Sequence, residues 1–332
     1  MKLPFLLALL IGAANSPAPA SAPLRQEFQA FGKPAEIEIR DLPPETARQV
    51  IQKALAEIAD VERLTSADRA DGGIAALNAA AGSGPQPVDP RLLTALSRAN
   101  DFCFWSEGAH GPLGRDLYSI WGLRTPVEKP PAAERVEKAV GLAACGGLAL
   151  DAQKGTATLA AGGGLDLWGF AEGLAVDRAV EILRQGSAGN GFVRVGAVQR
   201  GFGPGPGGKG WPVLLPRISG TEESAGQVYL RDRSLAVAAQ SDHPLQNSET
   251  TGFPYINQRT GQPARGVLAA AAITDAALDA EGLAAALLIA GPREGQLRMG
   301  SLRPRPSVLW LLGSGTGAPL QVGYRWSEVN RR

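Results

Sequence analysis

Two kinds of hydrophobic periodicity alternate along this chain, and this alternation limits its possible folds more than any other feature. Residues Glu36 to Arg40 alternate between charged and apolar types, which is the period of a half-buried strand. Pro43 and Pro44 then precede a run from Glu45 to about Leu64 in which apolar residues recur at helical spacing. A chain that changes period in this way is expected to pack helices against sheets. The sequence therefore predicts the α+β class.

The same alternation continues toward the C-terminus. Helices are expected from Pro90, from Gly173 to about Gln185 and from about Asp275 to Ala290. Short strands are expected at Phe192 to Val195, Val213 to Leu215, Val228 to Leu230, Leu235 to Ala238 and Val308 to Leu312. The 332 residues show no repeat of fixed period and no obvious interdomain linker. One mixed α+β domain is the simplest architecture, with mixed sheets flanked by helices.

The first 22 residues are typical of an export signal. Lys2 is followed by the short apolar stretch Leu3 to Ala13 and then by small residues, with cleavage favoured after Ala20 over Ala22. About eleven apolar residues are too few to span a bilayer. No Cys precedes Cys103, so a lipid-modified N-terminal Cys is excluded. We expect residues 23–332 to form a soluble domain in the periplasm or otherwise outside the cytoplasm.

Composition removes several functional classes. The 33 Lys and Arg residues balance 32 Asp and Glu residues, so no electrostatic attraction to nucleic acid or to an anionic membrane is expected. With only two His and two Cys in the chain, a zinc site built from these ligands is nearly excluded, and any metal must depend mainly on oxygen ligands. Cys103 and Cys145 can form at most one disulfide, and the sequence leaves open whether they pair.

Two common catalytic patterns are incomplete in this sequence. Residues Gly203 to Gly210 nearly match a phosphate-binding loop, but Gly210 replaces the expected Ser or Thr and Trp211-Pro212 follows where a helix should begin. A flexible turn is the better interpretation. His110 and His243 are the available imidazoles, yet the chain has no Gly-x-Ser-x-Gly motif of a serine hydrolase.

The segment from Leu165 to Asp177 is more informative. It places Asp166, two glycines and Glu172 directly before an amphipathic helix. A helix N-terminus beside glycines offers backbone N–H groups to a ligand diphosphate. Glu172 could equally serve only to complement the helix dipole, and spacing alone does not decide between these two interpretations.

This segment resembles the hallmark of the FAD:protein FMN transferases, the ApbE-type proteins, and further motifs follow in the order of that family. They are Phe28 to Gly32, Ile58 to Asn78, Gly108 to Pro112 with Leu117 and Trp121-Gly122, Ala236 to Ala238 with Asp242, Ile256 to Gly261, and Glu281 to Gly291. The resemblance covers about residues 28–291. It implies a single ApbE-like domain and an enzyme that moves the FMN half of FAD onto a Thr of an exported or membrane redox protein, with Mg²⁺ and release of AMP.

The resemblance also implies roles for individual residues. Ala109, His110 and Gly111 would line the flavin site, Asp166 and Glu172 would contact FAD, and Ile256 would lie against the flavin. The Gly169 carbonyl and the Glu281 carboxylate would hold Mg²⁺, with Asp279 assisting. No protein nucleophile is required, because the acceptor Thr attacks the diphosphate.

Several positions depart from the family pattern. The family has Phe-Asp where this chain has His110-Gly111, Asp-Pro where it has Asn257-Gln258, and a metal-binding Thr where it has Ala285. Gly-Gly-Asp becomes Gly196 to Val198, and the His expected before the Arg-Thr-Gly motif is missing near Pro254. Two hypotheses follow: a magnesium-dependent FMN transferase of weakened activity, and a non-catalytic periplasmic relative that binds flavin or a partner. A small-residue segment from Ser314 to Pro319 faintly resembles the acceptor motif, but an ordinary turn explains it better.

Overall fold

The computed structural model describes residues 22–215, 224–240, 255–313 and 320–327. Four sequence predictions concern residues outside these ranges. They are the export signal up to residue 21, the turn at Asp242, the imidazole of His243 and the Ser314 to Pro319 segment.

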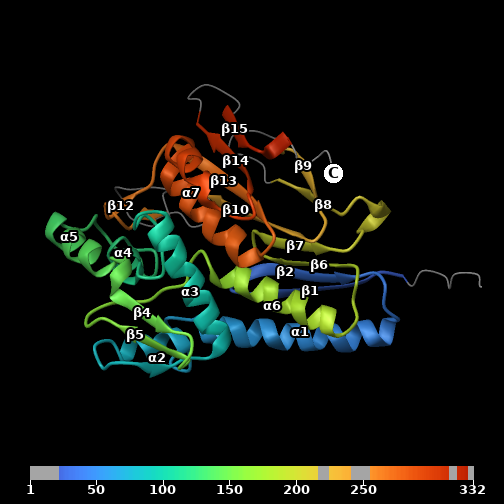
Figure 1. Ribbon diagram of the computed structural model, residues 1–332, viewed down its shortest axis with the longest axis horizontal. Coiled ribbons are helices and arrows are strands. Elements are labelled where there is room, and N and C mark those ends of the chain that lie inside the picture. The colour runs from blue at the N-terminus through green and yellow to red at the C-terminus, as the bar shows by residue number, and fades with distance from the viewer. Residues whose placement is uncertain (1–21, 216–223, 241–254, 314–319, 328–332) are drawn as a thin grey trace, which may run out of the picture.

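An eight-stranded sheet forms the centre of the molecule (Figure 1). Its strand order is β1-β2-β6-β7-β10-β13-β14-β15, and each neighbouring pair is antiparallel. The strands are β1 (Leu24–Ala30), β2 (Lys33–Ile39), β6 (Gly191–Val195), β7 (Val198–Phe202), β10 (Arg233–Ala239), β13 (Val267–Thr274), β14 (Ser307–Leu312) and β15 (Leu320–Tyr324). The N-terminal hairpin therefore lies beside strands that come more than 150 residues later.

Three long helices cover one face of this sheet. They are α1 (Pro44–Thr65), α6 (Ala171–Gln185) and α7 (Ala277–Arg298). Helix α6 lies between α1 and α7, as Figure 1 shows. Helix α7 is interrupted at Gly291, whose φ is 70°, and Pro292 follows inside it. The expected end near Ala290 coincides with this break, after which the helix resumes.

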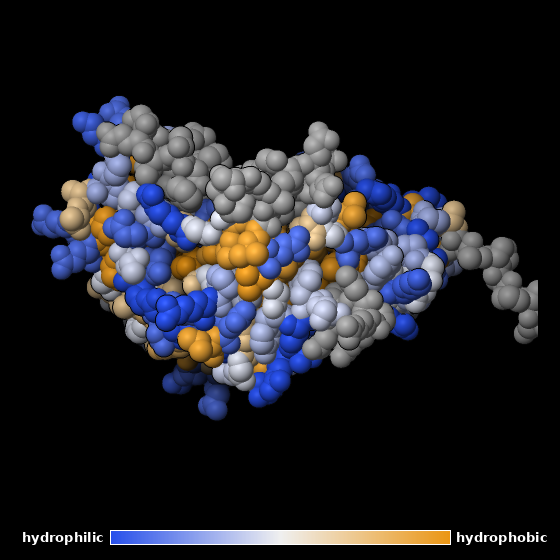
Figure 2. All heavy atoms as spheres, turned by 90° about the horizontal axis from the view of Figure 1, so that it is seen from above, coloured by the Kyte–Doolittle hydropathy of each residue, from blue (hydrophilic) through white to orange (hydrophobic). Residues whose placement is uncertain are grey.

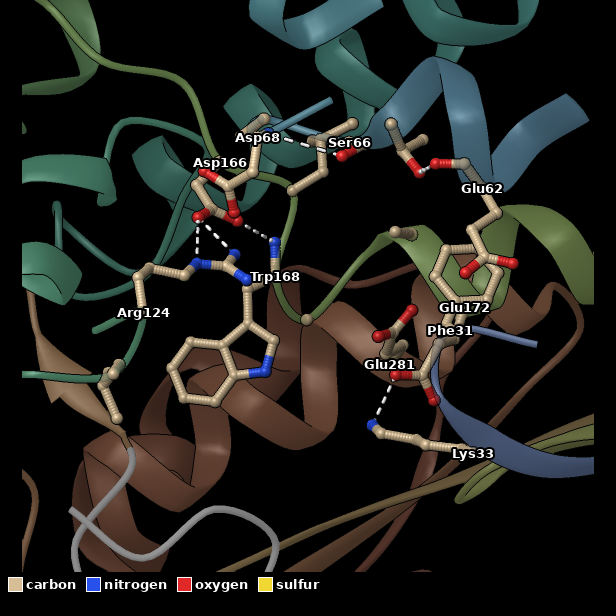
Figure 3. Close-up of a pocket in the computed structure, with 16 residues that line it drawn as sticks. Phe31, Lys33, Glu62, Ser66, Asp68, Arg124, Asp166, Trp168, Glu172 and Glu281 are labelled. Atoms are coloured by element: carbon tan, nitrogen blue, oxygen red, sulfur yellow. Dashed lines mark hydrogen bonds and ion pairs between the residues drawn. The ribbon is translucent and has the colours of Figure 1, made fainter. Parts of the chain in front are cut away.

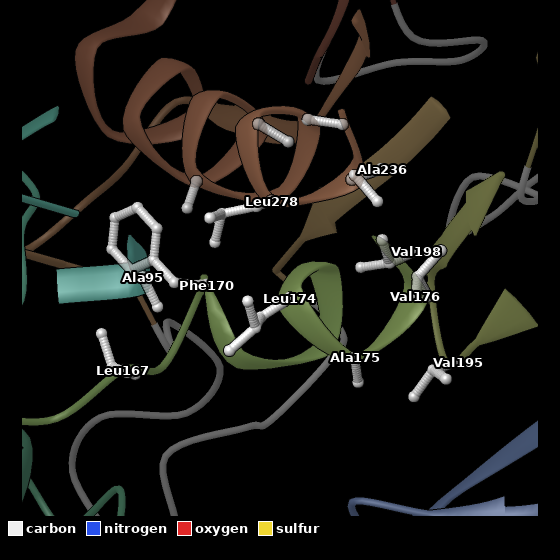
Figure 4. Packing of buried hydrophobic residues seen from close by; sticks show 14 of the residues in the cluster. Ala95, Leu167, Phe170, Leu174, Ala175, Val176, Val195, Val198, Ala236 and Leu278 are labelled. Atoms are coloured by element: carbon white, nitrogen blue, oxygen red, sulfur yellow. The ribbon is translucent and has the colours of Figure 1, made fainter. Parts of the chain in front are cut away.

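The other face of the sheet is covered in part by the hairpin of β8 (Trp211–Leu214) and β9 (Gln227–Leu230). Because both faces are covered, the central strands carry apolar residues that alternate between two cores. In β13, Ala270 and Ala272 belong to the helix-side core, whereas Ala271 and Ile273 belong to the hairpin-side core. Figure 4 shows the helix-side core around Phe170, Leu174 and Leu278, where α6 and α7 meet the sheet.

A smaller group of elements lies at one end of the molecule (Figure 1). It contains α2 (Gly73–Ala79), α3 (Pro90–Trp105), α4 (Arg115–Ile120), α5 (Ala133–Leu142) and a three-stranded sheet of β3 (Gln86–Pro87), β5 (Thr156–Leu159) and β4 (Leu148–Asp151). A disulfide joins Cys103 near the end of α3 to Cys145 in the short 3₁₀ helix η1 (Cys145–Gly147). The pairing that the sequence left open is thus present.

The remaining short elements connect these parts. They are η2 (Pro206–Gly208), the two-stranded pair of β11 (Ile256–Asn257) and β12 (Gln262–Pro263), and η3 (Met299–Ser301). Residues Gly203 to Gly210 form a turn around η2 that leads into strand β8. The interpretation of this segment as a turn is confirmed, because strand β8, and not an α-helix, follows it.

Figure 2 shows one face, where apolar atoms gather mainly in a central strip between hydrophilic areas. Large apolar side chains that are strongly exposed in the described ranges are Phe104, Leu214, Leu297 and Leu320. Within the described residues, none of the helices has the length and apolar character needed to cross a membrane.

Candidate functional site

A cavity of about 300 Å³ lies where the β1–β2 turn, the end of α1, the start of α6 and helix α7 meet (Figure 3). A second cavity of about 30 Å³ adjoins it. Five residues line both cavities: Lys33, Trp168, Gly169, Glu172 and Glu281. The segment that the sequence singled out therefore forms the boundary between the two cavities.

Backbone and side-chain hydrogen bonds hold this segment in place. The Leu165 N–H donates to Asn78 Oδ1 over 2.7 Å, and Asn78 Nδ2 donates back to the Leu165 carbonyl over 3.0 Å. The Asp166 N–H donates to the Pro112 carbonyl over 2.8 Å. Gly169 then takes a φ of 84°, a conformation that favours glycine, and α6 begins two residues later. The turn directs Asp166 and Glu172 toward the larger cavity.

Asp166 is buried and paired inside the protein. Its side chain is only 3% exposed, and its carboxylate accepts hydrogen bonds from Arg124 Nε over 2.8 Å and from the Trp168 N–H over 2.9 Å. A second contact comes from Arg124 Nη2. Arg124, whose side chain is 36% exposed, also lines the cavity. The group of this pair that a ligand can reach more easily is therefore the guanidinium.

Lys33, Glu172 and Glu281 form a charged group on the boundary between the cavities. Lys33 Nζ lies 2.5 Å from Glu172 Oε1. Glu281 Oε2 accepts a hydrogen bond from the Gly173 N–H over 2.6 Å. Burial raises the pKa of Glu281 well above its ordinary value, and the negative charge of Glu172 raises it further, while the charge of Lys33 acts in the opposite direction. Two carboxyl groups thus share one nearby ammonium.

An aromatic wall completes the boundary. The indole of Trp168 stacks on Tyr255 with ring centroids 5.3 Å apart and meets Tyr118 edge-on at 5.0 Å. Phe31 also lines the larger cavity, from the turn between β1 and β2 (Figure 3). A cavity with aromatic rings and cationic side chains can accommodate a ligand that combines planar rings with phosphate groups.

The structure brings together four of the residues that the sequence predicted. Asp166, Gly169, Glu172 and Glu281 line the larger cavity. Ala109, His110, Gly111 and Ile256 are buried and are not among the described residues that line the two cavities. His110 lies directly behind the wall, because a Cβ on Gly169 would be 3.0 Å from its Nε2. The flavin contacts of these four buried residues remain predictions.

Asp279 lies elsewhere. Its carboxylate is held by Arg98, with Nε to Oδ1 at 2.5 Å and Nη2 to Oδ2 at 3.2 Å. It does not line either cavity in the described part of the chain. The structure therefore does not bring Asp279 to Glu281 as a second ligand on the cavity, because Arg98 already binds both of its oxygens.

Comparison with known proteins identifies the family of this chain. The model of the ApbE family matches residues 31–306. The chain belongs to the ApbE family. A FAD:protein FMN transferase of Treponema pallidum (strain Nichols) is 27% identical over 275 residues, which are 75% of this chain and 73% of that protein.

Solved ApbE structures share the fold. The apo flavinyl transferase ApbE of Pseudomonas stutzeri aligns with a TM-score of 0.82 at 18% identity, covering 94% of this chain and 98% of that one. The ApbE protein of Thermotoga maritima aligns with a TM-score of 0.82 at 21% identity, covering 94% and 100% of the two chains. The predicted fold, one ApbE-like α+β domain, is confirmed.

The donor set of this ApbE protein does not fit the predicted Mg²⁺ ion. Residue 285 is a buried alanine without a side-chain oxygen, and Asp279 is bound by Arg98. Glu172 is bound by Lys33, whose ammonium would stand a few ångströms from any dication at these carboxylates. In the described ranges, no three His, Cys, Asp or Glu side chains gather in a way that could hold a metal.

Sequence reasoning missed the cationic and aromatic half of the site. Lys33 is separated from Glu172 by 139 residues, and Arg124 from Asp166 by 42 residues. Trp168 lies within the recognised motif, but its stacking partner Tyr255 comes from a distant segment. One available signal for Lys33 was its position directly after the Phe31-Gly32 turn. There it begins strand β2 and lines the larger cavity.

Proposed function

We propose that this ApbE-family protein binds FAD in the larger cavity and transfers its FMN half to a Thr hydroxyl of an acceptor protein, with release of AMP. The observation that carries the proposal is the placement of the Asp166 to Glu172 segment on a cavity that also presents Lys33, Arg124 and Trp168. The activity for which the Treponema relative is named, FAD:protein FMN transferase, supports the same reaction.

The reaction is a displacement at phosphorus. The Thr oxygen forms a bond to the phosphorus of the FMN half, and the bond from that phosphorus to the bridging oxygen of the diphosphate breaks. AMP departs with the electron pair of that bond, and the hydroxyl proton passes to solvent. Positive charge near the diphosphate lowers the barrier to such a step, and Lys33 and Arg124 are the cations on the cavity wall.

We also propose that the protein acts outside the cytoplasm on an exported or membrane redox protein. The Cys103–Cys145 disulfide supports this location, since disulfides persist mainly in oxidising compartments. The proposed export signal agrees with it.

The test is to incubate residues 23–332 with FAD, with and without a Thr-containing acceptor domain, in Mg²⁺ and separately in EDTA. AMP release that depends on the acceptor, together with covalent flavin on its Thr, is the expected result. AMP release only in Mg²⁺ would show that the reaction requires the metal that the sequence predicted. Failure to bind FAD in both solutions would contradict the proposal.

A non-catalytic flavin-binding protein is a second candidate, and two observations favour it. Residue 285 lacks the side-chain oxygen of the family pattern. At position 111 the family's Asp has no room, because a Cβ on Gly111 would lie 2.5 Å from Cys103 Cβ and 2.8 Å from its Sγ. Bound FAD without any AMP in the same experiment would select this candidate over the transferase.

A further inference from the structure

We infer that the ammonium of Lys33 occupies the place of a divalent cation at this site, so that the protein binds the diphosphate of FAD without added metal. This inference rests on the proposed binding of FAD in the larger cavity and concerns how that cavity neutralises the ligand's charge. It assigns to Lys33 a role in binding that the motif in residues 166–177 does not contain.

The position of Lys33 is the first argument. It is the first residue of β2, immediately after the Phe31-Gly32 turn in which both residues have a positive φ. This turn brings Nζ within 2.5 Å of Glu172 Oε1, in the first turn of α6. Lys33 lines both cavities together with Gly169 and Glu281, and Figure 3 shows Lys33 and Glu281 at the larger one. Its ammonium therefore lies among the groups that the sequence assigned to the metal and to FAD.

The surrounding charges are the second argument. Two of the carboxylates that the sequence assigned to this site are already paired: Asp166 with Arg124, and Asp279 with Arg98. Glu281 accepts the Gly173 N–H, and Ala285 offers no oxygen. The single positive charge of Lys33 neutralises Glu172 at this point. A dication here would be repelled by Lys33 and would find few protein ligands.

The chemistry of the ammonium is the third argument. An ammonium carries three N–H donors, so a carboxylate and a phosphate oxygen can both accept from it, and the hydrogen bonds to charged oxygens are strong. The Lys33 side chain is 28% exposed, compared with 10% for Glu172, so the ammonium lies on the accessible side of the pair. A diphosphate in the larger cavity can therefore reach it without dismantling the fold.

The experiment measures FAD affinity by flavin fluorescence for the wild-type protein, Lys33→Gln and the control Lys53→Gln, each in EDTA and in Mg²⁺. Lys53 is exposed on α1 and lines neither described cavity. The wild type and the control are expected to bind FAD equally well in EDTA and in Mg²⁺. Lys33→Gln is expected to bind about ten-fold or more weakly in EDTA, because it loses a charged donor.

Mg²⁺ provides the decisive comparison. Removing the ammonium removes the positive charge that repels a dication beside Glu172, so Mg²⁺ is expected to restore part of the FAD affinity of Lys33→Gln while leaving the wild type unchanged. A wild type that needs Mg²⁺ for binding would overturn the inference and leave the proposed function standing. A Lys33→Gln variant with wild-type affinity in EDTA, or one equally weak in both solutions, would also overturn it. Absence of FAD binding by the wild type in both solutions would overturn the proposed function itself.

A second substitution tests the same exchange from the opposite side. Ala285→Thr combined with Lys33→Gln adds a side-chain oxygen near Gly169, since Ala285 Cβ lies 3.4 Å from a Cβ placed there. The double variant is expected to show a larger gain in FAD affinity on adding Mg²⁺ than Lys33→Gln alone. An unchanged gain would contradict the placement of the cation. Thermal melting of every variant verifies that each is folded at the assay temperature.

Discussion

At the scale of single residues, burial determines what a motif residue such as His110 can do. The imidazole of His110 is 2% exposed and stacks on Phe170 at a centroid distance of 4.9 Å. Its Nε2 has no hydrogen-bond partner among the described residues. Burial lowers its pKa to about 3, so this imidazole is neutral near pH 7. His110 thus acts as part of the packed wall behind Gly169.

This shift predicts an acid sensitivity that belongs to one residue. Between pH 6.5 and about 3 the unfolded chain binds a proton at His110 that the folded protein excludes, so stability falls as the pH falls. From pH 7.5 to pH 5 the loss is about 2 kcal/mol for a group of this kind. His110→Phe is expected to remove this part of the loss in urea unfolding at the two pH values. His243 is kept in both proteins, so an unchanged loss would contradict the assignment to His110.

The Arg124–Asp166 pair predicts which of two substitutions lowers the free energy of unfolding more. Asp166 is almost fully buried, whereas Arg124 is 36% exposed. Arg124→Gln leaves a buried carboxylate without its cation and is expected to lower the free energy of unfolding by about 3 kcal/mol. Asp166→Asn leaves an arginine that can turn toward solvent and is expected to cost about 1 kcal/mol. Denaturant unfolding measures both free-energy losses. A larger loss for Asp166→Asn than for Arg124→Gln would show that the buried carboxylate does not depend on Arg124 for its charge balance.

At the scale of elements, the close contact of α6 with α7 positions the site. A Cβ on Gly173 would lie 2.5 Å from the Ala277 carbonyl oxygen and 2.6 Å from Leu278 Cα. This approach lets the Gly173 N–H reach Glu281 across the helix pair. Asp177, one turn farther along α6, accepts the Ala277 and Leu278 N–H groups over 2.9 and 3.0 Å. One end of α7 is thereby capped by a side chain from α6.

Gly173→Ala is therefore expected to force the two helices apart. Overpacking of this kind costs about 2 kcal/mol, and the displacement of Glu281 should weaken FAD binding as well. Gly141→Ala in α5 is the matched control, because nothing lies within 4 Å of its Cβ position. That control is expected to gain up to about 1 kcal/mol, since alanine favours a helix over glycine. Equal effects of both substitutions in thermal unfolding would contradict the close helix contact.

At the scale of the whole molecule, one disulfide ties the smaller group of elements together. It links α3 to η1 across 42 residues and packs against Gly111 in the loop behind the cavity. Closure of a loop of this length restricts the unfolded chain by about 4 kcal/mol on the entropic model. The bridge is therefore expected to stabilise the smaller group of elements under oxidising conditions.

The corresponding prediction compares oxidised and reduced protein. The double substitution Cys103→Ala with Cys145→Ala is expected to lower the free energy of unfolding by about 2 to 4 kcal/mol. Dithiothreitol should destabilise the wild type to a similar extent and leave the double variant unaffected, as measured by urea unfolding. A wild type that is insensitive to reductant under unfolding conditions would show that the bridge contributes little.

Local pattern was sufficient for the long helices, for several strands and for the family. The predicted helix at Glu45 to Leu64 is Pro44–Thr65 in the structure, and the predicted strand at Val308 to Leu312 is Ser307–Leu312. These elements follow from the burial of neighbouring residues along one segment, which leaves a period in the sequence. The order of short motifs around Asp166 likewise identified the ApbE family.

The tertiary structure alone decided which charges meet. Lys33 and Glu172 are brought together by the position of β2 in the sheet and by the start of α6, and no period in either segment encodes that distance. The same holds for Arg98 with Asp279, which removes a predicted metal ligand from the cavity. Sequence determined the oxygen-rich and histidine-poor chemistry that this protein can use. The structure determined which of those oxygens face a cation, because ion pairs depend on distances in space that the spacing along a chain does not record.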